Sequence, residues 1–165
     1  MVLLDVETLK EHLDYDPGTG VFTRKPTESF NPKVRAGEPA GYLSPDGYVY
    51  IRVLRKKYLA HRLAWFYMNG HWPSEIDHAN GTKNDNRICN LRESTRSQNM
   101  ANTIKPKHNS SGVKGVCYDK TNRKWLAYVV VNKRMRNLGR FDSFDEAVEK
   151  RKAEAERVFG EFARA

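Results

Sequence analysis

Four residues between positions 77 and 99 have side chains suited to hydrolytic chemistry: Asp77, His78, Asn90 and Asn99. A histidine can take a proton from water, which makes His78 the candidate general base of the set. The aspartate and one amide can hold a divalent cation through oxygen, and the second amide can orient the imidazole. Together these residue types predict metal-assisted cutting of a phosphodiester.

The charge and composition fit a polyanionic substrate. The chain has 165 residues and a formal net charge of +9, which favours binding to a nucleic acid. No apolar stretch is long enough to cross a bilayer, and the acidic N-terminus lacks the basic start of a secretory signal. The two cysteines, Cys89 and Cys117, lie in no CxxC pair, which argues against a disulfide framework and a cysteine-rich zinc site. We therefore expect a cytoplasmic protein with no membrane association.

The surrounding sequence indicates which elements would position these side chains. A strand is expected to close at residues 76–78, and Asn80-Gly81 marks a tight turn after it. Thr95-Arg96-Ser97-Gln98 has the form of a capping box, so a helix should begin near Thr95 with Asn99 in its first turns. The segments expected before this motif are a short helix over 3–13, a hairpin at YDPGTGVFTRK, two strands within 42–60 and a helix ending at Gly70.

At these positions the chain resembles the HNH endonucleases, specifically the phage and intron homing-endonuclease branch in which the third motif residue is Asn. The likeness covers roughly residues 10–103. The pieces that carry it are His61-Arg62-Leu63-Ala64-Trp65, Ile76-Asp77-His78, Asp85-Asn86-Arg87-Ile88, Asn90-Leu91-Arg92 and Gln98-Asn99.

This resemblance implies a ββα-metal site that cuts DNA with one divalent cation, Mg²⁺ or Mn²⁺. By carry-over, His78 is the general base, and Asp77 and Asn99 are the metal ligands. Asn90 would fix the orientation of the imidazole. The resemblance also implies a bacterial or phage-infected cell as the setting.

Two other metal sites fit the sequence less well. A calcium loop starting at Asp77 would place Ala79, Thr82 and Ile88 where oxygen ligands, Gly and Glu are needed. A structural zinc site from His61, His71, His78 and Cys89 has wide and irregular spacings. His61 itself is expected to be a packed or phosphate-contacting residue and is left out of the catalytic set.

The last third of the chain carries most of the positive charge. Residues 104–143 hold ten basic and two acidic side chains, a difference of +8. GVKGVCYD, KWLAYVVV and RNLGRF predict a three-stranded antiparallel sheet. A helix should follow with Ser143 as its N-cap, and its apolar residues should cover one face of the sheet. Those residues are Phe144, Ala147, Val148, Ala155, Val158 and Phe159.

This second segment is similar to the plant ethylene-response-factor type of DNA-binding domain. The matching residues are Gly112-Val113-Lys114-Gly115-Val116, Lys124-Trp125, Ala127, Leu138-Gly139, Phe141 and Glu146-Ala147. The resemblance implies that the sheet enters the DNA major groove. The candidate DNA-contacting residues by position are Lys114, Trp125, Arg134, Arg136 and Arg140. A basic solvated sheet with core aromatics, Trp125 among them, is the alternative.

We thus expect an α+β protein with an N-terminal ββα-metal (HNH) nuclease unit, flanked by antiparallel strands, and a C-terminal three-stranded antiparallel sheet packed on one helix. The expected domains are 1–103 (core motif about 58–103), a linker at 104–112 and 113–165. Double-stranded DNA is the expected partner of a monomer with no obligate protein partner. A sequence-specific DNA-binding regulator with an inactive HNH remnant is the main alternative, and an RNA-binding module is a third.

Overall fold

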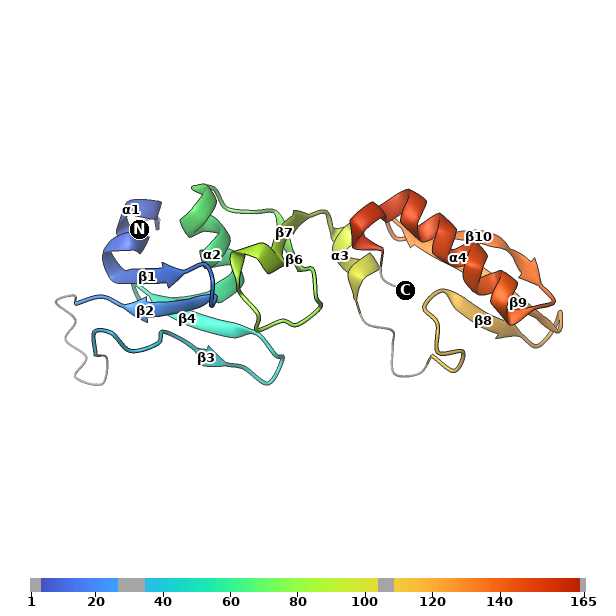
Figure 1. Ribbon diagram of the computed structural model, residues 1–165, viewed down its shortest axis with the longest axis horizontal. Coiled ribbons are helices and arrows are strands. Elements are labelled where there is room, and N and C mark those ends of the chain that lie inside the picture. The colour runs from blue at the N-terminus through green and yellow to red at the C-terminus, as the bar shows by residue number, and fades with distance from the viewer. Residues whose placement is uncertain (1–3, 27–34, 104–108, 164–165) are drawn as a thin grey trace. The chain divides into compact units, whose positions relative to one another are not determined.

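Apolar alternation and turn residues along the chain produce small antiparallel sheets and four α-helices in the part of the chain that the structure describes (Figure 1). The computed structural model describes residues 4–26, 35–103 and 109–163. These residues divide into two units, residues 1–93 and residues 94–165. Among the described residues, no helix is long and apolar enough to cross a membrane.

The first unit combines two helices with short strand pairs. In chain order its elements are α1 (Val6–His12), β1 (Leu13–Asp16), β2 (Val21–Arg24), β3 (Tyr42–Leu43), β4 (Val49–Val53), β5 (Lys56–Leu59), α2 (Ala60–Asn69), β6 (Glu75–His78), a 3₁₀ turn (Ile88–Asn90) and β7 (Leu91–Ser94). β1 pairs with β2, β4 lies between β3 and β5, and β6 pairs with β7. The short helix and the hairpin expected from the sequence are therefore confirmed, whereas residues 42–60 form three strands in place of the two expected.

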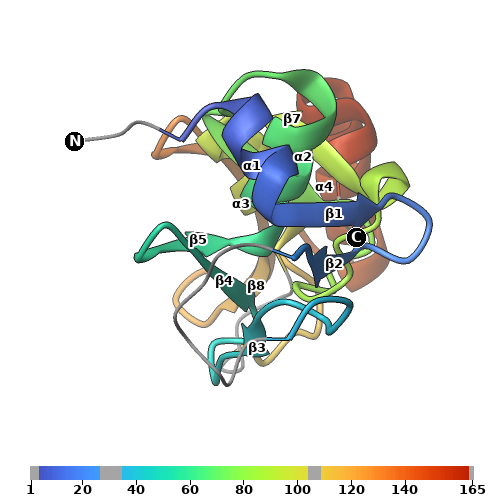
Figure 2. The same ribbon diagram turned by 90° about the vertical axis from the view of Figure 1, so that its left-hand side faces the viewer.

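One apolar core joins the elements of the first unit. Helices α1 and α2 lie side by side over the β1–β2 hairpin, as Figure 2 shows. Leu9, Leu13, Phe22, Ile51 and Leu63 are almost completely buried in this core. Full burial of each such side chain contributes on the order of 1.5–3 kcal/mol. The core thus packs α2 and the hairpin together in the same unit as the segment that carries Asp77 and His78.

Local sequence signals explain where the helices begin and end. α2 stops at Gly70, whose φ of 75° lets its N–H bond the carbonyl of Phe66. α3 (Arg96–Asn102) begins with the expected capping box, in which the Thr95 side chain accepts from the Gln98 N–H and the Gln98 side chain accepts from the Thr95 N–H. Both expectations are confirmed.

The second unit contains α3, a three-stranded sheet and a long helix. Its further elements are β8 (Val116–Asp119), β9 (Lys124–Val131), β10 (Arg134–Phe141), α4 (Phe144–Phe159) and a 3₁₀ turn (Gly160–Phe162). The strand order is β10-β9-β8, and both pairs are antiparallel. Ala127 and Val129 of β9 are buried against α4, which lies along one face of the sheet (Figure 1). The expected sheet packed on one helix is confirmed.

The two compact units meet within the end of the expected nuclease domain. The division falls between Glu93 and Ser94, so α3 and its Asn99 belong to the second unit. The expected domain limits at 103 and 113 stay a prediction. Residues 104–108, the first part of the expected linker, lie outside the described residues.

Candidate active site

Strand β6 delivers the two central residues of the motif into a buried position. Asp77 and His78 are 4% and 6% exposed, although both are polar. After His78 the chain makes a loop of residues 79–90, which we call the active-site loop. The loop closes where the N–H of Ala79 donates to the carbonyl of Asn90 at 2.9 Å. Buried polar groups require hydrogen-bond partners, so the loop must supply them.

Asn90 holds this loop together from inside. Its Oδ1 accepts from the backbone N–H of Asn80 at 3.0 Å, and its Nδ2 donates to the carbonyl of Asp85 at 2.8 Å. This placement differs from the expected contact with the imidazole. The buried amide of Asn90 is satisfied by backbone groups of the loop at residues 80 and 85.

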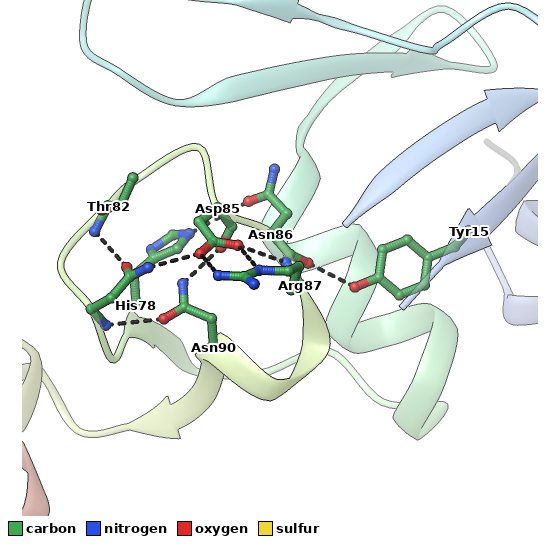
Figure 3. A network of polar contacts seen from close by, with 8 residues as sticks. Tyr15, His78, Thr82, Asp85, Asn86, Arg87 and Asn90 are labelled. Carbon is green, nitrogen blue, oxygen red and sulfur yellow. Dashed lines mark hydrogen bonds and ion pairs between the residues drawn. The ribbon is translucent and has the colours of Figure 1, made fainter. Parts of the chain in front are cut away.

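The amide that contacts the imidazole is that of Asn86. Its Oδ1 lies 3.4 Å from Nε2 of His78, and the Asn86 side chain is buried (Figure 3). Figure 3 also shows Tyr15 reaching this loop from β1, where its hydroxyl donates to the carbonyl of Asn86 at 2.7 Å. An acceptor at Nε2 favours the tautomer that carries its proton there and leaves Nδ1 as the basic nitrogen.

Asp85 fixes the middle of the active-site loop. Its carboxylate pairs with the Arg87 guanidinium at 2.6 Å and accepts from Nδ2 of Asn80 at 2.7 Å. The hydrogen bond from Arg87 is the main reason that the pKa of Asp85 falls to about 2. The loop therefore has charged and amide contacts at residues 80, 85, 87 and 90, which set the direction of Asn86.

Two histidines and a tyrosine pack together at the end of β6. The ring of His61 from α2 meets the His78 ring edge-on at 4.9 Å, and Tyr48, the residue just before β4, lies 5.3 Å from His61 and 6.1 Å from His78. Burial lowers the pKa of His61 to about 3, with further contributions from His78 and Arg62. Burial also lowers the pKa of His78, although Asn86 and Asp77 oppose this shift. Both imidazoles are neutral at pH 7, which a general base requires.

Asp77 forms a buried ion pair with Arg92 of the neighbouring strand β7. The Nε of Arg92 lies 2.8 Å and one terminal nitrogen 2.7 Å from the same oxygen, Oδ2. The side chains are 5% and 17% exposed, so solvent screens this pair little. Arg92 thereby sets the plane of the Asp77 carboxylate.

The proposed metal ligands are of types that suit a hard divalent cation. Asp77 has a carboxylate and Asn99 of α3 an amide oxygen, and oxygen donors suit Mg²⁺ and Mn²⁺. The described residues contain no group of three His, Cys, Asp or Glu side chains able to hold a metal. Because Asp77 and Asn99 lie in different units, their joint role as ligands stays a prediction.

Three residues near His78 were not in the predicted catalytic set. Asn86 and Arg92 stand in the segments Asp85-Asn86-Arg87-Ile88 and Asn90-Leu91-Arg92, which carried the resemblance. Their place in the motif could therefore have identified them from the sequence. The contact that each makes could not be predicted in this way. His61 was expected to be a packed or phosphate-contacting residue, and its near-complete burial agrees with the packed alternative.

The five residues expected to contact DNA fall on different sides of the second unit. The ammonium of Lys114 donates to carbonyl oxygens of Met100, Ala101 and Thr103 at 2.6, 3.0 and 3.2 Å. A cation at the C-terminus of α3 satisfies carbonyls that have no partner within the helix. Lys114 thus binds the end of α3, and its expected contact with DNA stays a prediction.

The strand register shows on which face of the sheet each of the other four residues lies. Trp125 packs edge-on against Phe144 of α4 at 4.7 Å, so its side of β9 is the helix-covered one. Arg136 pairs in register with Val129 on that same side and binds Glu154 of α4 at 3.0 Å. Arg134, which pairs with Val131, follows the same alternation. Arg140 pairs with Leu126 and therefore lies on the other face, which we call the open face.

One comparison with known proteins gives a match. A family model described as HNH endonuclease matches residues 58–101. The matched segment contains the end of β5, α2, the active-site loop and α3 up to Ala101, and it supports a nuclease enzyme. Neither the curated proteins nor the solved structures include a match to this chain.

The burial of His61 predicts a loss of stability in acid. The folded protein keeps this imidazole neutral down to about pH 3, whereas an unfolded histidine takes up a proton below about 6.5. The unfolded state therefore binds more protons between these values, and the free energy of unfolding should fall as pH decreases from 6.5 to 3. Urea unfolding of His61→Phe at several pH values should show a smaller slope than the wild type. An unchanged slope in His61→Phe would contradict this prediction.

The Asp77–Arg92 pair predicts strong coupling between two substitutions. Arg92→Met removes the guanidinium from a buried carboxylate and should reduce the free energy of unfolding by roughly 3 kcal/mol. Adding Asp77→Asn should restore part of this loss, because the amide carries no charge. A double-mutant cycle measured by urea unfolding checks this, with a coupling energy of about 0.5–3 kcal/mol expected. Simple additivity would show that the pair does not act as a unit.

Proposed function

We propose that this protein is a metal-dependent DNA endonuclease of the HNH homing type, and that its second unit selects the cleavage site. The observation that carries this proposal is the buried, neutral His78 beside Asp77, within the segment that matches the HNH endonuclease family. A neutral imidazole next to a carboxylate has no evident purpose in a simple binding surface, because burying both polar groups costs free energy.

In this proposal the side chains of the active-site segment have separate tasks. Nδ1 of His78 takes a proton from the attacking water, while its Nε2 faces Asn86. Asp77 and Asn99 hold one Mg²⁺ or Mn²⁺, which, when bound, supplies positive charge to the scissile phosphate and the leaving 3′ oxygen. Arg92 keeps the Asp77 carboxylate in one orientation. Asn90 serves the base indirectly, by holding the loop that contains Asn86.

The open face of the second unit is the surface that we propose for the DNA major groove. A sheet face left uncovered by its helix can enter this groove, where arginine reads guanine. Arg140 lies there in register with Leu126 and pairs with Asp119 at 2.8 Å. Side chains that share the open face by alternation along the strands are Cys117, Asp119, Lys124, Leu126, Tyr128, Val130, Met135, Asn137 and Arg140.

The first unit offers a further basic and aromatic face to DNA. On the sheet β3-β4-β5, Tyr42 stacks on Tyr50 at 6.1 Å, and the ammonium of Lys57 lies 3.7 Å from the centre of the Tyr50 ring. Tyr42 is 55% exposed, and Arg52 points outward beside Lys57 in the strand register. Cations interleaved with aromatic rings are typical of nucleic-acid contacts.

A DNA-binding regulator with an inactive HNH site is the alternative. It uses the same basic faces and differs only in lacking catalysis. The polar contacts around His78 favour the enzyme, because a site without a function has no reason to retain a buried base with an oriented tautomer.

Removal of the base or the metal should stop cleavage and leave binding intact. With Mg²⁺ the wild-type protein should nick or cut plasmid DNA, and excess EDTA should abolish this. His78→Ala should lower the cleavage rate by about 10²–10⁴-fold, because general-base catalysis contributes that much, while DNA affinity changes little. Asp77→Ala and Asn99→Ala should shift the metal titration of cleavage to higher concentration. Cleavage by His78→Ala at the wild-type rate would contradict the role of His78 as general base.

The two arginines on opposite faces of the second unit provide a matched pair for DNA binding. In a His78→Ala background, Arg140→Ala should weaken binding to a preferred site by about 1–3 kcal/mol if this arginine reads a guanine. Arg136→Ala should change affinity little, because Arg136 binds Glu154 on the helix side. Gel shifts at several salt concentrations measure both. Equal losses for the two variants would show that the open face is not the reading surface.

A further inference from the structure

The β1–β2 hairpin contains a motif, Tyr15-Asp16-Pro17-Gly18-Thr19-Gly20, that the proposed chemistry does not use. Its turn is held by its own side chains: Asp16 accepts from the Gly18 N–H at 2.9 Å and from the Thr19 hydroxyl at 2.8 Å. Such a turn is ordinarily only a connection between strands. Here, however, it lies against the active-site loop, more than sixty residues later in the chain.

Three contacts join this hairpin to a short stretch of that loop. The Tyr15 hydroxyl donates to the carbonyl of Asn86 at 2.7 Å, and the carbonyl of Pro17 accepts from the N–H of Ile88 at 3.2 Å. Between them Gly20 approaches the loop so closely that a Cβ would lie 2.4 Å from the backbone nitrogen of Arg87. Gly20 also has a φ of 75°, so both space and backbone conformation require glycine.

These contacts surround Asn86, whose side-chain oxygen lies next to the imidazole of the proposed base. Asn86 is 3% exposed, and its backbone carbonyl is fixed by Tyr15 while its side-chain oxygen lies 3.4 Å from Nε2 of His78 (Figure 3). A side chain whose backbone is fixed and whose surroundings are packed has few orientations available. The position of the imidazole acceptor is therefore set from outside the motif, by the hairpin.

The hydroxyl of Tyr15 is suited to this task. Its ring is packed against Phe22 at 4.7 Å and Tyr67 at 5.7 Å, which prevents rotation away from the loop. Burial raises the pKa of Tyr15, with Asp16 contributing, so the hydroxyl remains a hydrogen-bond donor at any working pH.

We propose that the β1–β2 hairpin positions the general base: Tyr15 and Gly20 fix the backbone at Asn86, and the Asn86 side chain holds His78 as the Nε2–H tautomer with Nδ1 directed to the reacting water. This inference rests on the proposed role of His78. Tyr15, Gly20 and Asn86 are positioning residues, because they act on the reaction only through the imidazole.

The first test compares two conservative substitutions in one aromatic cluster. Tyr15→Phe removes the hydroxyl that binds the loop. Tyr67→Phe removes the hydroxyl of the neighbouring ring in the same aromatic cluster. With Mg²⁺ and full-length protein, Tyr15→Phe should lower kcat for plasmid cleavage by about tenfold, a part of the whole general-base effect. KM and DNA affinity should stay near wild type, the variant should remain folded at the assay temperature, and Tyr67→Phe should leave kcat unchanged. Equal kcat for Tyr15→Phe and the wild type, or equal losses in both variants, would overturn the proposal.

The second test observes the imidazole without metal or DNA. Nitrogen-15 NMR of the full chain, with His78 assigned from His78→Ala, reports which ring nitrogen carries the proton. The wild type should show the Nε2–H tautomer, and Asn86→Ala and Tyr15→Phe should show a mixture. Asn86→Asp keeps an acceptor and should restore the Nε2–H form. An Nε2–H signal unchanged in Asn86→Ala would overturn the proposal.

The two tests separate this inference from the proposed function. If the wild-type protein does not cleave DNA, the proposed function fails, while the tautomer measurement still decides whether the hairpin orients His78. If the wild type cleaves and neither kcat nor the tautomer responds to Tyr15 and Asn86, the positioning role alone is wrong.

Discussion

The burial of a polar strand end is the constraint on which the rest of the first unit depends. Asp77 and His78 are withdrawn from water at the end of β6, and each must then be compensated by protein groups. Arg92 compensates the carboxylate, and Asn86 contacts the imidazole. These partners are in turn held by their neighbours in the fold. The buried Asp77-His78 pair is therefore the centre of a network of polar contacts that extends from β7 to the N-terminal hairpin.

Low exposure also determines the chemistry that the histidine can perform. An imidazole in water would be partly protonated near neutral pH, whereas burial lowers the pKa of His78 and keeps a lone pair available. His61 adds a second neutral ring at its edge without bringing a charge. The same desolvation that costs folding free energy therefore maintains the basic form of the proposed catalyst.

A different constraint organises the second unit. One helix can cover only one face of a three-stranded sheet, so every residue of β9 is either a core residue or an open-face residue. Trp125 and Arg136 lie on the side that α4 covers. There Trp125 makes an aromatic contact and Arg136 an ion pair with Glu154. Arg140 falls on the open side. Alternation along a strand thus separates similar basic residues into structural and DNA-facing groups.

The local pattern of the sequence was enough to predict most elements. The capping box at Thr95, the left-handed stop at Gly70 and the three strands after Gly112 depend on neighbours within a few residues, and all were confirmed. Composition and motif spacing likewise identified Asp77 and His78 as the centre of the candidate site. Such features need no knowledge of distant contacts, because hydrogen bonds and turns over three or four residues decide them.

Which amide meets the imidazole, and which face each arginine occupies, was decided by the tertiary structure. Asn86 and Asn90 are both asparagines of one loop, and only the folded loop directs one to His78 and the other to Asn80 and Asp85. Lys114 is a candidate DNA contact by its position in the resemblance, and only the folded structure shows that carbonyls at the end of α3 bind its ammonium. The sequence alone determined the kinds of groups present and their local elements. Their partners depended on packing between segments far apart in the chain, because hydrogen bonds and ion pairs form only within about 3–4 Å, a distance that sequence spacing does not reveal.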